Sequence, residues 1–124
     1  MTHTQSKFYS SIFFAARPKT LPAAIIPILL GSFLANSLSY ESDLILLISI
    51  LLSAICIQIA TNFFNDALDN IKGADTLNRI GPKRISASGE LTSQSLIIAG
   101  ITFCFMAITL SLIHISEPTR RWSI

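Results

Sequence analysis

The sequence predicts an all-α membrane protein with three transmembrane helices. Hydrophobic residues make up 51% of its 124 residues, and charged residues only 13%. Three apolar windows, at residues 21–40, 44–60 and 95–115, contain no Lys, Arg, Asp or Glu. About 20 helical residues, each rising about 1.5 Å, cross a hydrocarbon core of about 30 Å. Because lipid offers the backbone no hydrogen bonds, each window is expected to be a helix.

Residues 1–19 precede the first window and are expected to form a cytoplasmic interfacial segment. The stretch "KFYSSIFFAA", residues 7–16, combines aromatic and basic side chains, which is typical of a short helix lying in the membrane interface. Packing of this helix under the bundle is the alternative. A cleaved signal peptide fits less well, because the apolar region is too long and its charged leader too extended. Pro22 and Pro27 can kink the first transmembrane helix without excluding it.

Basic residues set the expected orientation. Lys7, Arg17 and Lys19 precede the first window, whereas the connection around residues 41–43 has no basic residue. Basic side chains return between the second and third windows, at Lys72, Arg79, Lys83 and Arg84. By the positive-inside rule, the N-terminus and the loop of residues 66–93 are expected in the cytoplasm. The net charge of +2 is too small to indicate a nucleic-acid partner.

Residues 116–124, "SEPTRRWSI", do not fit this topology. Three spans would put Arg120 and Arg121 on the non-cytoplasmic side, against the positive-inside rule. Either the third helix is displaced, or this tail is the foreign end of a truncated reading frame. The similarity of "LIHISEPTRR" to a translated adapter favours the second interpretation. Residues 20–115 are therefore the expected transmembrane unit.

Polar side chains line the expected continuation of the second helix. They lie at offsets of four, three, one and three residues, at Gln58, Asn62, Asn65, Asp66 and Asp69. Residues three or four apart share a helical face, so all five are expected on one side. A polar face at the mouth of a transmembrane helix is costly unless it meets a cavity, a partner or water. This face is the candidate functional site.

The two aspartates of this face indicate a magnesium site. Asp66 and Asp69 lie one turn apart and would repel each other, so a shared hard cation would relieve the repulsion. Magnesium binds few carboxylates together with phosphate oxygens and water, so the pair suits a metal-bridged diphosphate. Asn62 and Asn65 can add amide oxygens to the metal or amide hydrogens to phosphate.

The loop that follows carries complementary charges. Gly73 permits a sharp turn, and Asp75 can return a third carboxylate. Cations suited to phosphate follow at Lys72, Arg79, Lys83 and Arg84. Plainer interpretations stay open: the aspartates can mark a solvated helix end, and the basic residues can serve topology or anionic lipid. Gln58 is more simply a donor to a neighbouring helix.

Four stretches of this sequence resemble one family. "NDALD" at residues 65–69, "NIKGAD" at 70–75 and "NRIGPKR" at 78–84 are similar to the first aspartate-rich motif of the UbiA superfamily of membrane prenyltransferases. Together with "ARPKTLPA" at residues 16–23, they are most similar to the menaquinone branch, which acts on 1,4-dihydroxy-2-naphthoate. The resemblance covers about residues 13–112, and the motifs occur in the expected order.

The resemblance implies a fold and an activity. The chain would be the first part of a larger UbiA-type helical bundle in the inner or plasma membrane of a bacterium, surrounded by membrane lipid. The reaction would transfer a polyprenyl group from polyprenyl diphosphate to 1,4-dihydroxy-2-naphthoate, forming demethylmenaquinone, with Mg²⁺ as cofactor. The rival interpretations are a small non-enzymatic membrane subunit that binds a partner or lipid, and a transporter. The transporter is the weaker, because no charged residue lies at midmembrane depth.

The resemblance also implies a role for each candidate residue. Magnesium would be held by Asn65, Asp66, Asp69 and Asp75. The catalytic set would be Asp66, Asp69, Lys72 and Arg84, the last two neutralising charge on the leaving group. Substrate binding would fall to Asn62, Asn65, Arg17, Lys19, Arg79 and Lys83.

We expect the purified 124-residue chain to be inactive on its own. No second aspartate-rich motif follows Asp75, so the opposing carboxylates that would hold a second metal ion are lacking. The measurement is formation of prenylated product from a polyprenyl diphosphate and 1,4-dihydroxy-2-naphthoate in the presence of Mg²⁺. Detectable transfer by this chain alone would contradict the expectation.

Overall fold

The described part of the chain consists of helices and their connections. The structure, a computed structural model, describes residues 3–38, 43–73, 85–86 and 89–116. The elements are α1 (His3–Ala16), the short 3-10 helix η1 (Pro18–Thr20), α2 (Pro22–Ser37), α3 (Leu44–Ile71) and α4 (Ser93–Ser116). These ranges contain no strand, which confirms the predicted all-α fold.

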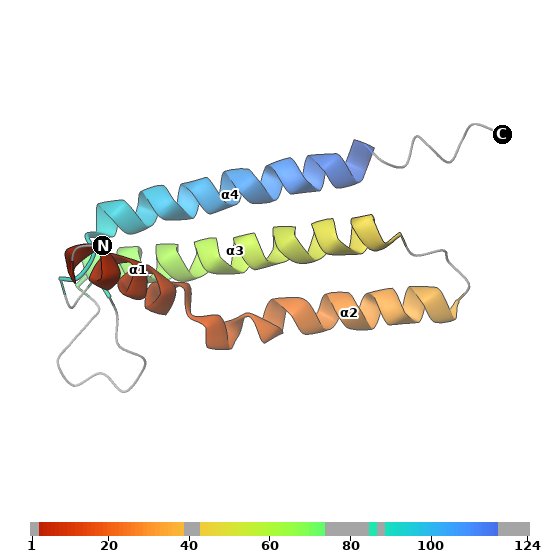
Figure 1. Cartoon of the computed structure of the whole chain (residues 1–124), viewed down its shortest axis with the longest axis horizontal. Helices are drawn as coiled ribbons and strands as arrows, with labels where there is room; N and C mark the ends of the chain where they lie inside the picture. Colours follow the sequence, from red (N-terminus) through yellow and green to blue (C-terminus); the bar gives the residue numbers. More distant parts are fainter. Residues whose placement is uncertain (1–2, 39–42, 74–84, 87–88, 117–124) are drawn as a thin grey trace.

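The three long helices lie side by side and alternate in direction (Figure 1). α3 packs mainly against α4 and less extensively against α2. The shorter α1 lies at the end of the bundle where α3 finishes and α4 starts. The fold therefore brings α1, η1 and the C-terminal end of α3 together.

Two helices are long and apolar enough to span a membrane by themselves. They are Leu44–Ile71 and the Ser93–Ile113 part of α4. The third predicted span is a broken one: Lys7–Thr20 and Pro22–Ser37 qualify only as a pair, bent by 47°. Alone, the 16 residues of α2 cover about 24 Å, less than the hydrocarbon core. By length and composition, the described residues thus give an integral membrane protein with two candidate spans, or three if the bent pair counts as one.

The break between α1 and α2 follows from two prolines and one residue with unusual backbone angles. Arg17 has a φ of 52°, in the left-handed region, and ends α1. Pro18 and Pro22 then occupy the first turns of η1 and α2, where the fixed φ of proline suits a helix start and its missing N–H is not needed. Pro27 lies within α2 and does not end it, as the sequence predicts.

Small side chains let α3 and α4 approach closely. Ser49, Ser53, Cys56 and Ala60 are all buried and recur every three or four residues on α3. The Ser53 hydroxyl donates to the Ala107 carbonyl of α4 at 3.1 Å. In lipid, helices associate through such packing and hydrogen bonds, because burying apolar surface gains little there.

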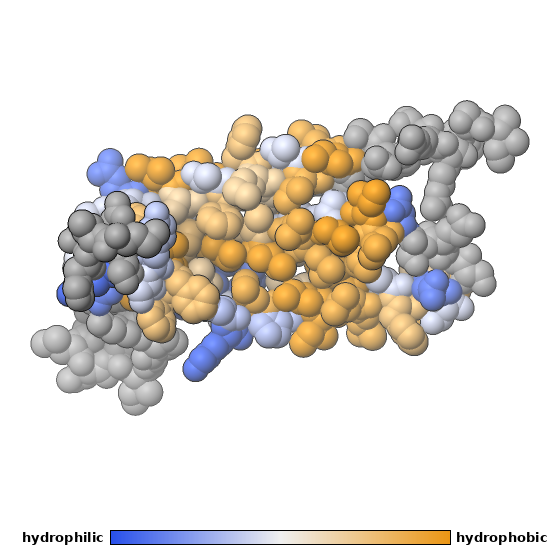
Figure 2. Space-filling model, in the orientation of Figure 1, coloured by the Kyte–Doolittle hydropathy of each residue, from blue (hydrophilic) through white to orange (hydrophobic). Residues whose placement is uncertain are grey.

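The core is concentrated at the α1 end of the bundle. Phe63 is fully buried and meets the Phe103 ring edge to face, with ring centres 5.8 Å apart. The buried apolar cluster around it draws on α1, α3, α4 and the connection between α3 and α4, through Ala15, Phe63, Ala67, Ile85, Leu91 and Leu96. The remaining length of the helices is covered with exposed apolar side chains (Figure 2), as expected of a surface that faces lipid.

α1 combines the two arrangements considered for it. Ser11 and Ala15, one turn apart, are buried against the bundle. Phe8, Tyr9 and Phe13 are exposed instead. One face of the helix therefore packs on the bundle while the other presents aromatic rings, so its predicted position in the membrane interface stays a prediction.

The sequence predicts a loop from residue 66, but α3 continues to Ile71. Asp66 and Asp69 are therefore helical, and the connection to α4 starts at Lys72. α4 begins at Ser93, and the hydroxyl of the preceding Thr92 accepts from the Ser95 N–H at 3.1 Å. Thr92 is therefore the cap.

Gly100 tests the close approach of α3 and α4. A Cβ at this position would lie 2.8 Å from the Phe64 ring, whereas a Cβ at Gly31 of α2 meets nothing within 4 Å. We expect Gly100→Val to lower the free energy of unfolding by about 1–3 kcal/mol, because the ring and the helix must move apart. Gly31→Val makes the same chemical change in open space and is the control. Thermal unfolding in detergent, followed by circular dichroism, measures both; equal losses would contradict the packing.

Candidate active site

The polar side chains of α3 gather at its C-terminal end, beside α1, η1 and the start of α4. The sequence predicts that these side chains form one polar stripe. In the structure they divide between two neighbouring segments instead. Gln58 and Asn62 turn toward η1, whereas Asp66 turns toward residues 85–86. Successive helical residues are about 100° apart, so a set that includes both Asn65 and Asp66 is too wide for one neighbour.

Thr20 holds η1 against α3. Its hydroxyl accepts from Asn62 Nδ2 at 2.9 Å and donates to the Arg17 carbonyl at 2.9 Å. Asn62, which is 4% exposed, also donates to the Ala16 carbonyl at 2.7 Å. Gln58 Nε2 reaches the same hydroxyl at 3.5 Å, which confirms the interhelical role predicted for Gln58. A hydroxyl has one donor and two acceptor positions, and here all three are used.

The contacts between η1 and α3 stabilise an unusual backbone conformation at Arg17. A left-handed backbone at a residue other than glycine costs about 1–2 kcal/mol, and the two hydrogen bonds from Thr20 to the Arg17 carbonyl offset that cost. The side chain is half-buried, and in the described part of the chain its buried Nη2 atom has no hydrogen-bond partner. A buried donor of this kind is costly to leave unpaired, so this guanidinium is suited to an anion.

Asp66 forms the second polar junction. Its side chain is 1% exposed, and its Oδ2 accepts from the Ile85 N–H at 3.1 Å. Its Oδ1 accepts from the Ser86 N–H at 3.2 Å and also meets the Ser86 hydroxyl. That hydroxyl lies 2.9 Å from the Asp66 carbonyl as well. The carboxylate therefore fixes the return of the chain toward α4.

Two further bonds support this return. Asn70 Nδ2 of α3 donates to the Ser93 hydroxyl at 2.8 Å. The Ser11 hydroxyl of α1 donates to Glu90 Oε2 at 2.7 Å. The first residue of α4 is thus tied to α3, and Glu90, just before α4, is tied to α1.

The other predicted site residues differ in exposure. Asp69 is half-buried, while Asn65, Lys72 and Lys19 are exposed on the same end of the bundle. Four of the predicted residues lie outside the described residues, namely Asp75, Arg79, Lys83 and Arg84.

The donor set of α3 is compatible with magnesium. Among the described residues, no group of three or more His, Cys, Asp or Glu side chains is placed to hold a metal ion. Magnesium needs no such cage, because it commonly takes one or two carboxylates and completes its shell with water and phosphate oxygens. Asp66 and Asp69 supply such a pair, and Asn65 adds an amide oxygen on the same helix.

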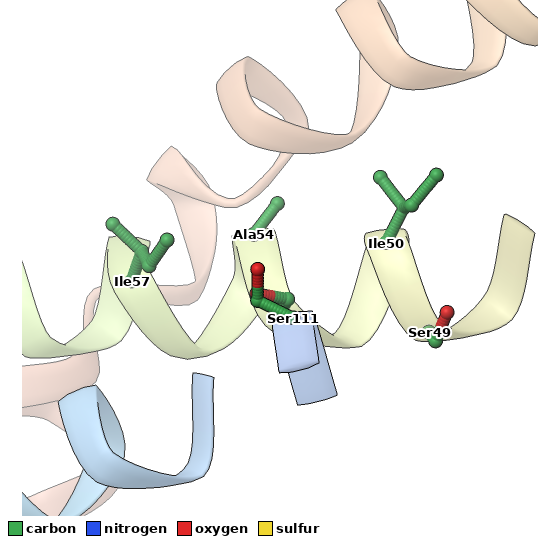
Figure 3. A pocket seen from close by; sticks show the side chains of 6 residues that line it. Ser49, Ile50, Ala54, Ile57 and Ser111 are labelled. Carbon is green, nitrogen blue, oxygen red and sulfur yellow. The ribbon is translucent and has the colours of Figure 1, made fainter. Parts of the chain in front are cut away.

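A shallow cavity of about 330 Å³ lies farther along α3, within the apolar part of the bundle. Ile50, Ala54 and Ile57 project into it from α3, and Ser111 closes it from α4 (Figure 3). Two more serines line it, but the Ser49 and Ser53 hydroxyls already donate to carbonyl groups. The cavity is therefore effectively apolar.

Thr20 and Ser86 are the two residues of the site that the sequence analysis missed. The contact of Thr20 with Arg17 could be expected from the sequence, because a threonine hydroxyl can donate to the backbone carbonyl three residues earlier. The contact of Ser86 could not, since its partner lies 20 residues earlier. Only the folded chain brings the two together.

Substitution of Asn62 tests the contact between η1 and α3. We expect Asn62→Ala to lower the free energy of unfolding by about 1–3 kcal/mol, because the part-buried Ala16 carbonyl loses its donor. Thr61→Val is the matched control, since the Thr61 hydroxyl is exposed and bonds only within its own helix, to the Ile57 carbonyl. Thermal unfolding in detergent compares the two. A loss for Thr61→Val as large as that for Asn62→Ala would show that the junction is not specific.

Comparison with known proteins identifies the family of this chain. The model of the UbiA prenyltransferase family matches residues 24–121. The chain is 35% identical over 114 residues to 1,4-dihydroxy-2-naphthoate octaprenyltransferase from Escherichia coli (strain K12), covering 89% of this chain and 37% of that protein. The proteins of the same name from Haemophilus influenzae (strain ATCC 51907 / DSM 11121 / KW20 / Rd) and Bacillus subtilis (strain 168) are 40% and 45% identical over 84 and 65 residues.

Coverage of these two relatives is smaller. The alignments take in 65% and 52% of this chain, and 27% and 21% of the respective relatives. The chain thus spans between about a fifth and somewhat over a third of the length of these three curated relatives. No solved structure matches significantly. The family match covers most of the chain, and this chain belongs to the UbiA prenyltransferase family.

Proposed function

We propose that this chain forms one aspartate-rich part of the active site of a membrane prenyltransferase. The reaction transfers a polyprenyl group from polyprenyl diphosphate to 1,4-dihydroxy-2-naphthoate and forms the prenylated naphthoquinol, which is the reduced form of demethylmenaquinone. The observation that carries the proposal is the buried Asp66 carboxylate at the end of a membrane-spanning helix, with Asp69 one turn farther along. The relatives named 1,4-dihydroxy-2-naphthoate octaprenyltransferase support the choice of acceptor.

The chemistry requires charge stabilisation rather than a protein nucleophile. The allylic carbon–oxygen bond breaks, and its electron pair leaves with the diphosphate. The ring carbon that bears the carboxylate then bonds to the allylic carbon. Loss of carbon dioxide from that carbon returns the electron pair to the ring. Preorganised cations aimed at the leaving oxygens lower the barrier of the first step.

Magnesium, when bound, would neutralise charge on the diphosphate oxygens. The residues proposed to hold it are Asn65, Asp66, Asp69 and Asp75. Lys72 and Arg84 are proposed to take up leaving-group charge, and Arg79 and Lys83 to bind the phosphates. The exposed position of Lys72, directly after α3, supports its part in this set.

Arg17 is proposed to bind an anionic group of a substrate. Its unpartnered Nη2 atom and its strained backbone support this role, because a carboxylate or phosphate oxygen would supply the missing acceptor. Asn62 takes part by holding the adjacent turn, and Lys19 by adding an exposed positive charge beside it. The apolar cavity lined by Ile50, Ala54 and Ile57 is proposed to contact the prenyl chain.

We also propose that this end of the bundle faces the cytoplasm. Lys19 belongs to η1, which starts directly after Arg17 and bonds to Asn62 in the C-terminal part of α3, and Lys72 follows the end of that helix. Such clustering is typical of the cytoplasmic side, in the inner or plasma membrane of a bacterium. Residues 1–19 would then lie in the interface on that side, where the exposed aromatic rings of α1 suit the headgroup region.

A chimera tests the proposed activity. Residues 1–115 replace the matching part of the Escherichia coli relative, and menaquinone is measured in cells that lack their own enzyme. We expect Asp69→Asn to lower its formation by about 10²–10³-fold, because the leaving diphosphate loses electrostatic stabilisation. Asp66→Asn is expected to do the same, but Asp69 is the sharper test because Asp66 also anchors residues 85–86.

Asp43→Asn is the control for this chimera. Asp43 caps the opposite end of α3 by accepting from the Ile45 N–H at 2.9 Å, and asparagine caps equally well. Its menaquinone level should equal that of the unsubstituted chimera, with protein amounts compared by immunoblot. Full activity in the Asp69→Asn chimera would contradict the proposal and favour a non-enzymatic membrane subunit.

A further inference from the structure

The Ser86 side chain meets Asp66 at two points. Its hydroxyl contacts Oδ1 of the carboxylate and lies 2.9 Å from the Asp66 carbonyl. Its backbone N–H donates to the same Oδ1 at 3.2 Å. Both residues are buried, with 1% and 7% of their surfaces exposed. No residue of this turn was singled out by the sequence, yet it makes the closest described contacts of the candidate metal ligand.

These contacts fix the orientation of a buried charge. A carboxylate that has left water needs hydrogen-bond donors to replace it, and three donors from Ile85 and Ser86 do so here. An aspartate held by a single donor can rotate about its terminal bond. Donors on both oxygens hold the plane of the carboxylate, and the hydroxyl group adds a third point of contact.

The same contacts limit what else Asp66 can bind. A carboxylate has about four lone-pair positions, two on each oxygen. Oδ1 meets the Ser86 N–H and hydroxyl, whereas the described part of the chain offers Oδ2 a single donor, the Ile85 N–H. Among the described contacts, Oδ2 therefore keeps one lone-pair position for a cation. A cation can take it as a monodentate ligand without displacing the turn.

We propose that Ser86 is a positioning residue, which orients the Asp66 carboxylate so that Oδ2 offers its remaining lone pair to a divalent cation. The inference rests on the proposed function, in which Asp66 holds Mg²⁺. It adds a residue that touches neither metal nor substrate. Hydrogen-bond partners of metal ligands typically change metal affinity by about 10–100-fold when they are removed.

The first test is limited proteolysis of the purified 124-residue chain in detergent, without metal. The peptide bond after Arg84 is a trypsin site, and its amide is the buried Ile85 N–H that donates to Asp66. Cleavage there requires the turn to open. We expect Ser86→Ala to speed formation of the fragment that begins at Ile85 by roughly tenfold, since cleavage follows the open population. Ser86→Thr keeps the hydroxyl and should restore the slow rate.

Ser93→Ala is the matched control. It removes another serine hydroxyl that accepts a hydrogen bond between two elements at this end of the bundle, from Asn70 Nδ2, without touching Asp66. Its cleavage rate after Arg84 should equal that of the unsubstituted chain. An unchanged rate in Ser86→Ala, or an equal rise in Ser93→Ala, would overturn the inference.

The second test measures metal binding by the same four chains. Mn²⁺ replaces Mg²⁺, and electron paramagnetic resonance reports the free ion. We expect Ser86→Ala to weaken Mn²⁺ binding about tenfold, with Ser86→Thr and Ser93→Ala close to the unsubstituted chain. Unchanged or tighter binding in Ser86→Ala would overturn the positioning role, even if cleavage is faster. Absence of Mn²⁺ binding by the unsubstituted chain would contradict the proposed metal site itself.

Discussion

The lack of hydrogen-bond partners in lipid is the constraint on which this structure depends. Backbone groups within the membrane must pair inside each helix, and polar side chains must find a protein partner or reach the end of the bundle. Ser49 and Ser53 of α3 find protein partners, since they donate to carbonyl groups of α3 and α4. The amides and carboxylates of α3 lie toward the end of the bundle instead, from Gln58 onward.

At that end, the polar residues build the architecture as well as the site. Asn62 ties η1 to α3, and Asp66 ties the return of the chain to the same helix. The partners of both are mainly backbone groups of irregular segments, which have no helical partner of their own. The same side chains that satisfy these segments also place Arg17 and Ser86 beside α3. The candidate site and the fold thus use one set of hydrogen bonds.

The sequence predicted the helices well because each depends on local composition. The apolar windows correspond to α2, α3 and α4, and Thr92 caps the last. Helical spacing also located the polar end of α3, but it could not say what each side chain meets. The division between Asn62 and Asp66, and the contact of Ser86 with a residue 20 positions earlier, depend on how η1 and residues 85–86 return to the helix. The prolines mark the break at Arg17 locally, whereas the contact of Thr20 with Asn62 that supports it depends on the tertiary structure.

The anchoring contacts of Asp66 are compatible with its proposed role as a metal ligand. A fixed ammonium or guanidinium partner would compensate the charge of a carboxylate and compete with a cation, whereas neutral hydrogen-bond donors do not compete in this way. The described donors to Asp66 are two backbone amides and one hydroxyl, all neutral. They stabilise the anion without neutralising it. If Asp66 holds the metal ion as proposed, its carboxylate is already oriented before the ion binds, and such preorganisation is what lowers the cost of stabilising charge that develops on a leaving group.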